Sequence, residues 1–114
     1  MPTRSILAQY PAHRDDIGDL LTRRPVPGPH VQQIDPFLFL NHHGPQTYPP
    51  DNDGLPFGPH PHRGFETVTF ILEGSLAHLD SAVHESVIEA GGVQWMTAGR
   101  GLIHAEVSPP AFKR

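Results

Sequence analysis

The chain has 114 residues and a formal net charge of −4. We expect a single domain over residues 1–114, since a chain of this length can bury one modest core. Its Lys and Arg residues form no cluster larger than the pairs Arg23-Arg24 and Lys113-Arg114, so the sequence lacks the basic patch of a direct nucleic-acid binder. The absence of Cys excludes a disulfide framework and a thiolate metal site.

Proline and glycine are frequent, with 14 Pro and 11 Gly residues. This content is typical of a β protein rich in turns and falls short of low-complexity disorder. No apolar run approaches the length of a membrane span, and the segment Met1–Leu7 does not resemble a signal peptide. We therefore expect a cytoplasmic protein that does not associate with membranes.

The first half of the chain gives weak signals. Ser5–Tyr10 could form a short strand, and the polar stretch 15–24 is compatible with either a helix or a loop. Phe37–Leu40 is a short apolar run bounded by Pro36 and Asn41, which predicts a buried strand. Residues 44–59 are dense in Pro, Asp, Asn and Gly and predict a loop.

The second half predicts successive strands separated by glycine turns. Thr67–Leu72 is rich in β-branched and aromatic residues and ends at Glu73-Gly74, so Leu76–Asp80 is expected to be its hairpin partner. Three further strands are expected at 86–89, 93–97 and 102–107. Short strands without a convincing long helix predict an all-β sandwich or small barrel. Its core should include Phe65, Phe70 and Trp95.

Two short pairs, His60/His62 and His104/Glu106, each place metal-capable side chains two residues apart. In a strand this spacing puts both side chains on one face. Two such strands could supply three imidazole nitrogens and one carboxylate oxygen to a single ion with open positions. Glu66 is a fifth candidate if one regular strand runs over 60–66, although Gly64 weakens that assumption.

Imidazole and carboxylate donors without thiolate are compatible with Fe(II), Mn(II), Ni(II), Cu(II) or Zn(II). Open positions on such an ion could take water, O₂ or a chelating substrate. The remaining histidines have no comparable partners in the sequence, and we expect none of them to be a ligand: His13, His30, His42, His43, His78 and His84.

The two histidine motifs lie in longer blocks that resemble the pirin family of the cupin superfamily. The first block covers 60–68 and is followed by Leu72-Glu73-Gly74, and the second covers 94–101 and is followed by His104-Ala105-Glu106. Asp35-Pro36-Phe37-Leu38 and the Arg23-Arg24 segment are similar to the amino-terminal region of the family. The resemblance extends over roughly residues 20–110.

This resemblance implies an amino-terminal cupin domain, a β-sandwich built as a double-stranded β-helix, with its motif core at about 35–108. It implies one metal ion, usually iron and hence Fe(II), held by His60, His62, His104 and Glu106, while Glu66 is the weaker candidate. Glu106 would act as ligand or as base for a substrate hydroxyl.

The family includes flavonol-cleaving dioxygenases of the quercetin 2,3-dioxygenase type, which act on a small aromatic substrate, and iron-dependent transcriptional co-regulators. Both roles would use the same site, so the motif does not separate an enzyme from a regulatory or protein-binding module.

The chain also departs from the family. Pirin-like proteins normally have two cupin domains, and the first continues past the His-x-Glu strand, whereas this chain stops eight residues after Glu106. We therefore expect a fold that is incomplete at its carboxyl end, favouring a fragment of a longer product. The alternatives are a homo-oligomer or a protein partner that covers the missing strands, and an inactive truncated relative.

Overall fold

The computed structural model describes residues 2–109, and no helix occurs in that range. Its strands are β1 (His13–Arg14), β2 (Thr22–Val26), β3 (Leu40–His43), β4 (Phe57–His62), β5 (Glu66–Phe70), β6 (Ser75–Asp80), β7 (Glu85–Glu89), β8 (Val93–Thr97) and β9 (Leu102–Val107). The all-β prediction is confirmed. The described part of the chain accordingly holds no helix that could cross a lipid bilayer.

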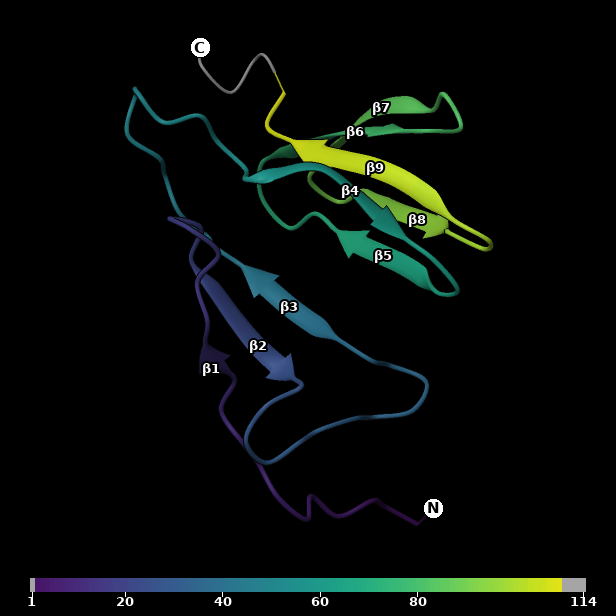
Figure 1. The fold of residues 1–114 in the computed structure, drawn as a ribbon. Helices are drawn as coiled ribbons and strands as arrows, with labels where there is room; N and C mark the ends of the chain where they lie inside the picture. Colours follow the sequence, from purple (N-terminus) through teal and green to yellow (C-terminus); the bar gives the residue numbers. More distant parts are fainter. Residues whose placement is uncertain (1, 110–114) are drawn as a thin grey trace. The chain divides into compact units, whose positions relative to one another are not determined.

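Two compact units divide the chain, one ending at Gln46 and one starting at Thr47. In the first unit β1, β2 and β3 form an antiparallel sheet in that order (Figure 1). Thr22 is fully buried, and its hydroxyl lies 2.9 Å from Nδ1 of His43, its partner on β3. Leu20 and Val26 are the buried apolar side chains of this unit. That 1–114 forms one domain stays a prediction.

Two strand predictions for the first unit are wrong. Ser5–Tyr10 is not a strand, Leu7 is 96% exposed, and no strand among the described residues pairs with this segment. In Phe37–Leu40 only Leu40 lies in a strand, and all four side chains are exposed. The Phe37 N–H donates to the Ile34 carbonyl, which closes a turn around Pro36 and prevents an extended run. The ambiguous stretch 15–24 contains a turn and the start of β2, not a helix.

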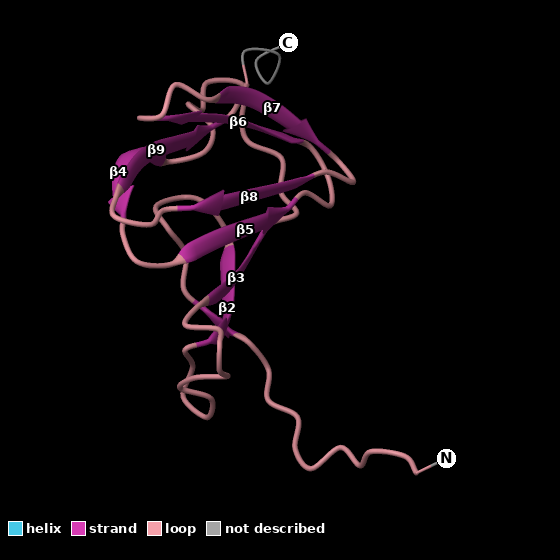
Figure 2. Cartoon of the chain, turned by 90° about the vertical axis from the view of Figure 1, so that its right-hand side faces the viewer, coloured by secondary structure: helices cyan, strands magenta, loops and turns pink. Residues whose placement is uncertain are grey.

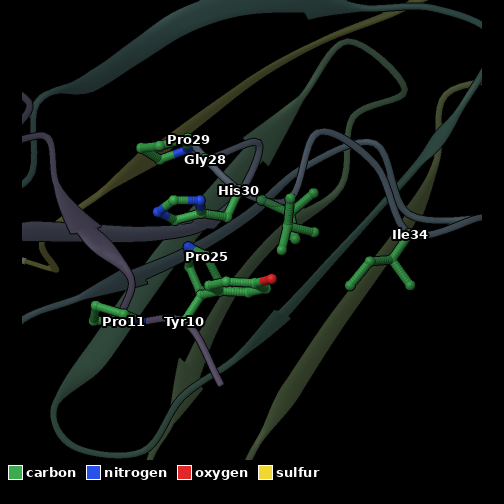
Figure 3. A pocket seen from close by; sticks show the side chains of 9 residues that line it. Tyr10, Pro11, Pro25, Gly28, Pro29, His30 and Ile34 are labelled. Atoms are coloured by element: carbon green, nitrogen blue, oxygen red, sulfur yellow. The ribbon is translucent and has the colours of Figure 1, made fainter. Parts of the chain in front are cut away.

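The second unit is built from two sheets. One has the strand order β4-β9-β6-β7 and the other pairs β5 with β8, and all pairings are antiparallel. Figure 2 shows β5 and β8 as a layer facing the larger sheet. Alternate side chains of β6 and β8 are buried, as expected for strands with one face turned toward a second layer. The buried set is partly polar: Leu76, His78, Gln94, Met96, Ala98 and His104.

The expected hairpin between Thr67–Leu72 and Leu76–Asp80 does not form. The chain does turn at Gly74, whose φ of +83° suits glycine, but β6 joins the larger sheet between β9 and β7. β5 pairs instead with β8, in a register that places Val68 opposite Trp95. A tight turn signal therefore predicted the reversal of the chain but not the sheet that the next strand enters.

The aromatic residues expected in the core are exposed. Phe70 and Trp95 are 69% and 67% exposed on the face of the β5–β8 pair that points away from the larger sheet, and Phe65 is 42% exposed. The less exposed face of the same pair carries Thr67, Thr69, Gln94 and Met96. The interior of this unit is more polar than a simple apolar pattern predicts, because it contains the histidine cluster described below.

Asp80 closes the β6–β7 turn from a side chain that is only 3% exposed. One of its oxygens accepts the backbone N–H groups of Ala82 and His84, and the other lies 2.9 Å from Nε2 of His78 and 3.3 Å from Nδ1 of His84. Burial alone raises the pKa of Asp80, but the hydrogen bonds from His78, His84 and Ala82 outweigh it and lower the pKa to about 2.

Replacing Asp80 by Ala should lower the free energy of unfolding by about 2–4 kcal/mol near neutral pH, because buried donors lose their acceptor. Since the folded pKa lies below the ordinary value of 3.8, the stabilisation by the carboxylate is present above about pH 4 and is lost as the pH falls toward 2. Urea unfolding at several pH values measures the effect. The matched control is His84→Ala, whose exposed ring should contribute under about 0.5 kcal/mol; equal losses in the two variants would contradict the prediction.

Candidate metal centre

The candidate site is assembled by the antiparallel pairing of β4 with β9. His60 lies directly opposite His104 in this register, and His62 follows two residues later on the same strand. Side chains two residues apart share a face of a strand, so the three imidazoles point to the same side. The sequence-based expectation that the two pairs meet across neighbouring strands is correct for these three histidines.

The three rings converge through their Nε2 atoms. Nε2 of His104 lies 2.7 Å from Nε2 of His60 and 3.0 Å from Nε2 of His62. Two nitrogens bound at about 2.1 Å to one ion, at right angles, are roughly 3 Å apart. The observed spacings therefore match neighbouring ligands of one ion.

The protonation of the rings also fits a metal site. Nδ1 of His60 lies 2.6 Å from the Gly58 carbonyl, so this nitrogen carries the proton and leaves the Nε2 lone pair for a ligand. Burial lowers the pKa of His104 to about 4, assisted by the neighbouring histidines, and burial also lowers the pKa of His62. Neutral imidazoles are the form that binds metal ions.

Glu106 lies beside His104 but on the other side of its ring. Its Oε1 is 3.7 Å from Nδ1 of His104, and burial raises the pKa of its carboxyl group. His78, His104 and Glu106 offer donor atoms within 4.8 Å of one another, as do His60, His62 and His104. The structure thus groups the three predicted histidines and places the predicted carboxylate next to them; that Glu106 binds the same ion stays a prediction.

The Glu66 carboxylate binds side chains of β8. β4 ends at His62 and β5 begins at Glu66, with Gly64 at a φ of +79° between them, so no single strand runs over 60–66. The Glu66 carboxylate accepts hydrogen bonds of 3.0 Å from Nε1 of Trp95 and from the Thr97 hydroxyl, both on β8. Through these hydrogen bonds Glu66 links β5 to β8.

His78 and Asp80 lie beside the histidine cluster, and the sequence alone does not predict them there. His78 is 3% exposed, and its ring centre lies 5.3 Å from that of His104. Asp80 lies opposite His104, and His78 lies opposite Glu106, in the β6–β9 register. The sequence does contain a signal for this third pair, because His78 and Asp80 have the same two-residue spacing as His60/His62 and His104/Glu106.

The donor set defines the chemistry that the site can support. It comprises imidazole nitrogens and a nearby carboxylate, without thiolate, which suits a borderline divalent transition metal. His104 is 3% exposed, whereas His60 and His62 are only partly buried. The cluster is therefore buried on the side of β9 and accessible to solvent near β4. A bound ion could keep coordination positions open to small molecules.

Comparison with known proteins gives a consistent result. The family model described as Pirin matches residues 13–114. A pirin-like protein of Solanum lycopersicum is 41% identical over 105 residues, which cover 91% of this chain and 34% of the relative. A Pseudomonas aeruginosa protein named as a candidate quercetin 2,3-dioxygenase is 43% identical over 106 residues, covering 91% of this chain and 36% of its own length.

Solved structures show the same relationship. The crystal structure of quercetin 2,3-dioxygenase from Acinetobacter baumannii matches with a TM-score of 0.79 and 40% identity, over 88% of this chain and 33% of that one. The likeness confirms the predicted cupin-type fold. The chain spans about a third of the length of these relatives.

His104→Ala should weaken the binding of a divalent ion by roughly 100-fold or more, because the central nitrogen of the cluster is lost. Competition titration with Zn²⁺ or Fe(II) under anaerobic conditions measures the affinity. His84→Ala removes a histidine that lies outside the cluster and should leave the affinity unchanged. Equal loss in both variants would show that the cluster is not the binding site.

The two glutamates should respond differently to substitution. Glu106→Gln should lower metal affinity roughly 10- to 100-fold, whereas Glu66→Gln should leave it unchanged, since the Glu66 carboxylate is held by Trp95 and Thr97. The same titration compares the two variants. A larger loss for Glu66→Gln would reverse the assignment of the fourth ligand.

Proposed function

Because the chain belongs to the Pirin family, we propose that it binds one divalent metal ion through His60, His62, His104 and Glu106 and supports oxygenase chemistry on a flavonol-like substrate. The observation that carries this proposal is the convergence of three Nε2 atoms, with spacings of 2.7 and 3.0 Å at His104. A cluster of neutral nitrogen lone pairs is costly unless a cation or a shared proton occupies it.

Fe(II) is the ion we favour. Nitrogen and oxygen donors accept Fe(II) as well as Mn(II), Ni(II), Cu(II) and Zn(II), and iron is the metal usual in the family. Glu106 is the carboxylate that we propose as the fourth donor, because it lies two residues after His104 on the same face of β9 and its Oε1 is 3.7 Å from the His104 ring. With Glu106 the ion would have three nitrogen ligands and one oxygen ligand from the protein.

The proposed reaction is of the quercetin 2,3-dioxygenase type, which is the activity that the names of the relatives indicate. A bound redox-active ion would supply the centre at which O₂ and the oxygen donors of the substrate meet. His60, His62 and His104 would hold that ion from one side, and the partly exposed edge near β4 would admit the substrate. The Glu106 carboxylate would accept the proton of a substrate hydroxyl at one of its oxygens.

An assay with quercetin tests the enzymatic proposal. The Fe(II)-loaded chain should consume the flavonol in air but not under argon, and His104→Ala should abolish turnover while His84→Ala retains it. The decrease in flavonol absorbance, together with O₂ uptake, measures the reaction. Turnover that survives His104→Ala, or the absence of turnover with every redox-active metal tested, would contradict this function.

A metal-dependent protein-binding module is the second candidate function. The exposed Phe70 and Trp95 on the outer face of the β5–β8 pair favour it, since exposed aromatic side chains are enriched at protein interfaces. A net charge of −4 favours a protein partner over nucleic acid. Sedimentation of the chain with Fe(II) and with Fe(III) tests whether self-association depends on the oxidation state; identical profiles would count against this role.

Metal analysis of the natively purified chain separates both candidates from an inactive relative. A chain that contains no metal and cannot be loaded with any of the five ions would retain the fold without the function.

A further inference from the structure

A group of polar side chains on β6 and β9 adjoins the proposed metal cluster and shares His104 with it. In the β6–β9 register His78 is opposite Glu106 and Asp80 is opposite His104, so the four side chains form one cross-strand patch. His78 and His104 are each 3% exposed, and the Asp80 side chain is 3% exposed as well. Buried polar groups need hydrogen-bond partners, so the arrangement of protons in this patch is constrained.

The tautomer of His78 is fixed by Asp80. The two groups meet at 2.9 Å, between Oδ2 of Asp80 and Nε2 of His78. An ionised carboxylate can only accept hydrogen bonds, so Nε2 of His78 carries the proton. In the neutral ring Nδ1 is then an acceptor, and this atom is buried and lacks a hydrogen-bond partner.

The tautomer of His104 is fixed by the metal cluster. If Nε2 of His104 offers its lone pair to an ion, the single proton of the neutral ring sits on Nδ1. Nδ1 of His104 is also buried and without a hydrogen-bond partner, and the Oε1 atom of Glu106, at 3.7 Å, is beyond hydrogen-bond distance. One buried donor and one buried acceptor are thus left unpaired on neighbouring rings.

We propose that Nδ1–H of His104 donates to Nδ1 of His78, so that Asp80, His78 and His104 form a hydrogen-bonded relay that orients the central metal ligand. The ring centres are 5.3 Å apart. Two imidazoles turned so that their Nδ1 atoms point at each other would, at this separation, place those atoms about 3 Å apart, a contact that the two rings do not make in this structure. This inference rests on the proposed metal site. His78 is accordingly a positioning residue that acts through His104.

The relay also explains why the Glu106 carboxylate is available to bind the ion. A ligating histidine commonly gives its second N–H to a carboxylate, and the Glu106 carboxylate lies 3.7 Å from Nδ1 of His104. Because His78 takes that hydrogen bond in the relay, the Glu106 carboxylate stays available for the ion. A second ion among His78, His104 and Glu106 is disfavoured, since it would require lone pairs on both nitrogens of His104.

Nitrogen NMR of the full chain loaded with diamagnetic Zn²⁺ tests the relay directly. The spectra should show a proton on Nε2 of His78 and on Nδ1 of His104, and a scalar coupling between the two Nδ1 nuclei across the hydrogen bond. A His104 proton on Nε2, no coupling between the two rings, or two zinc ions per chain would overturn the relay.

The zinc affinity of three variants provides a second test of the relay. His78→Phe should weaken binding roughly 10- to 100-fold, whereas His78→Gln, whose side-chain carbonyl can accept the His104 proton, should stay within about threefold of wild type. His84→Ala, which contacts the same Asp80 carboxylate from an exposed position, is the matched control and should show no change.

The outcomes separate this inference from the metal site itself. Wild-type chain that binds no zinc would refute the metal site, and the relay with it. Tight binding in the wild type that is unchanged in a folded His78→Phe variant would refute the relay alone. If His78→Phe does not fold, as judged by circular dichroism, the affinity of His78→Gln and the wild-type NMR couplings decide.

Discussion

The pairing of β4 with β9 is the constraint on which the proposed site depends. These strands place His60 opposite His104, and the pleat carries His62 to the same side. No loop has to fold over the cluster to bring the nitrogens together, because regular backbone hydrogen bonds fix the distances. Sites built on strands hold their ligands more precisely than sites built on loops. A shift of one residue in this register would send His104 to the opposite face.

The polar interior of the second unit follows from the same arrangement. His104 faces away from solvent, and His78 and Asp80 lie beside it on β6, so the space between the sheets contains charge and hydrogen-bonding groups. Such groups are stable there only when each finds a partner. Asp80 satisfies four donors at once and links the β6–β7 turn to the histidine cluster. Local stability and site geometry are therefore connected through one carboxylate.

The spacing of the histidines predicted which side chains come together, whereas the strand signals did not predict how the strands pair. The two-residue spacing in His60/His62 and His104/Glu106 depends only on the pleat of a strand, which is local, and the cluster of three histidines follows from it. The pairing of strands that are distant in the sequence cannot be predicted from such local spacing. Nothing in Leu76–Asp80 says that it pairs with β9 and not with β5, and the exposure of Phe70 and Trp95 depends on which face meets the second sheet.

The role of Glu106 shows a further limit. Spacing alone predicts that it shares a face with His104, which the structure agrees with, but not which nitrogen of that ring it approaches. From the sequence His78 is not expected to be a ligand, although Asp80 lies two residues away. Cross-strand register, which pairs His78 with Glu106, is what turns this third pair into part of the site.

X-ray absorption spectroscopy of the chain loaded with one equivalent of Fe(II) tests the proposed metal centre, because it counts the ligands around the ion. We expect a first shell that includes three imidazole nitrogens, recognisable by the multiple scattering of the rings, with oxygen donors filling the other positions. A shell with one imidazole or none would contradict the metal centre proposed at His60, His62 and His104.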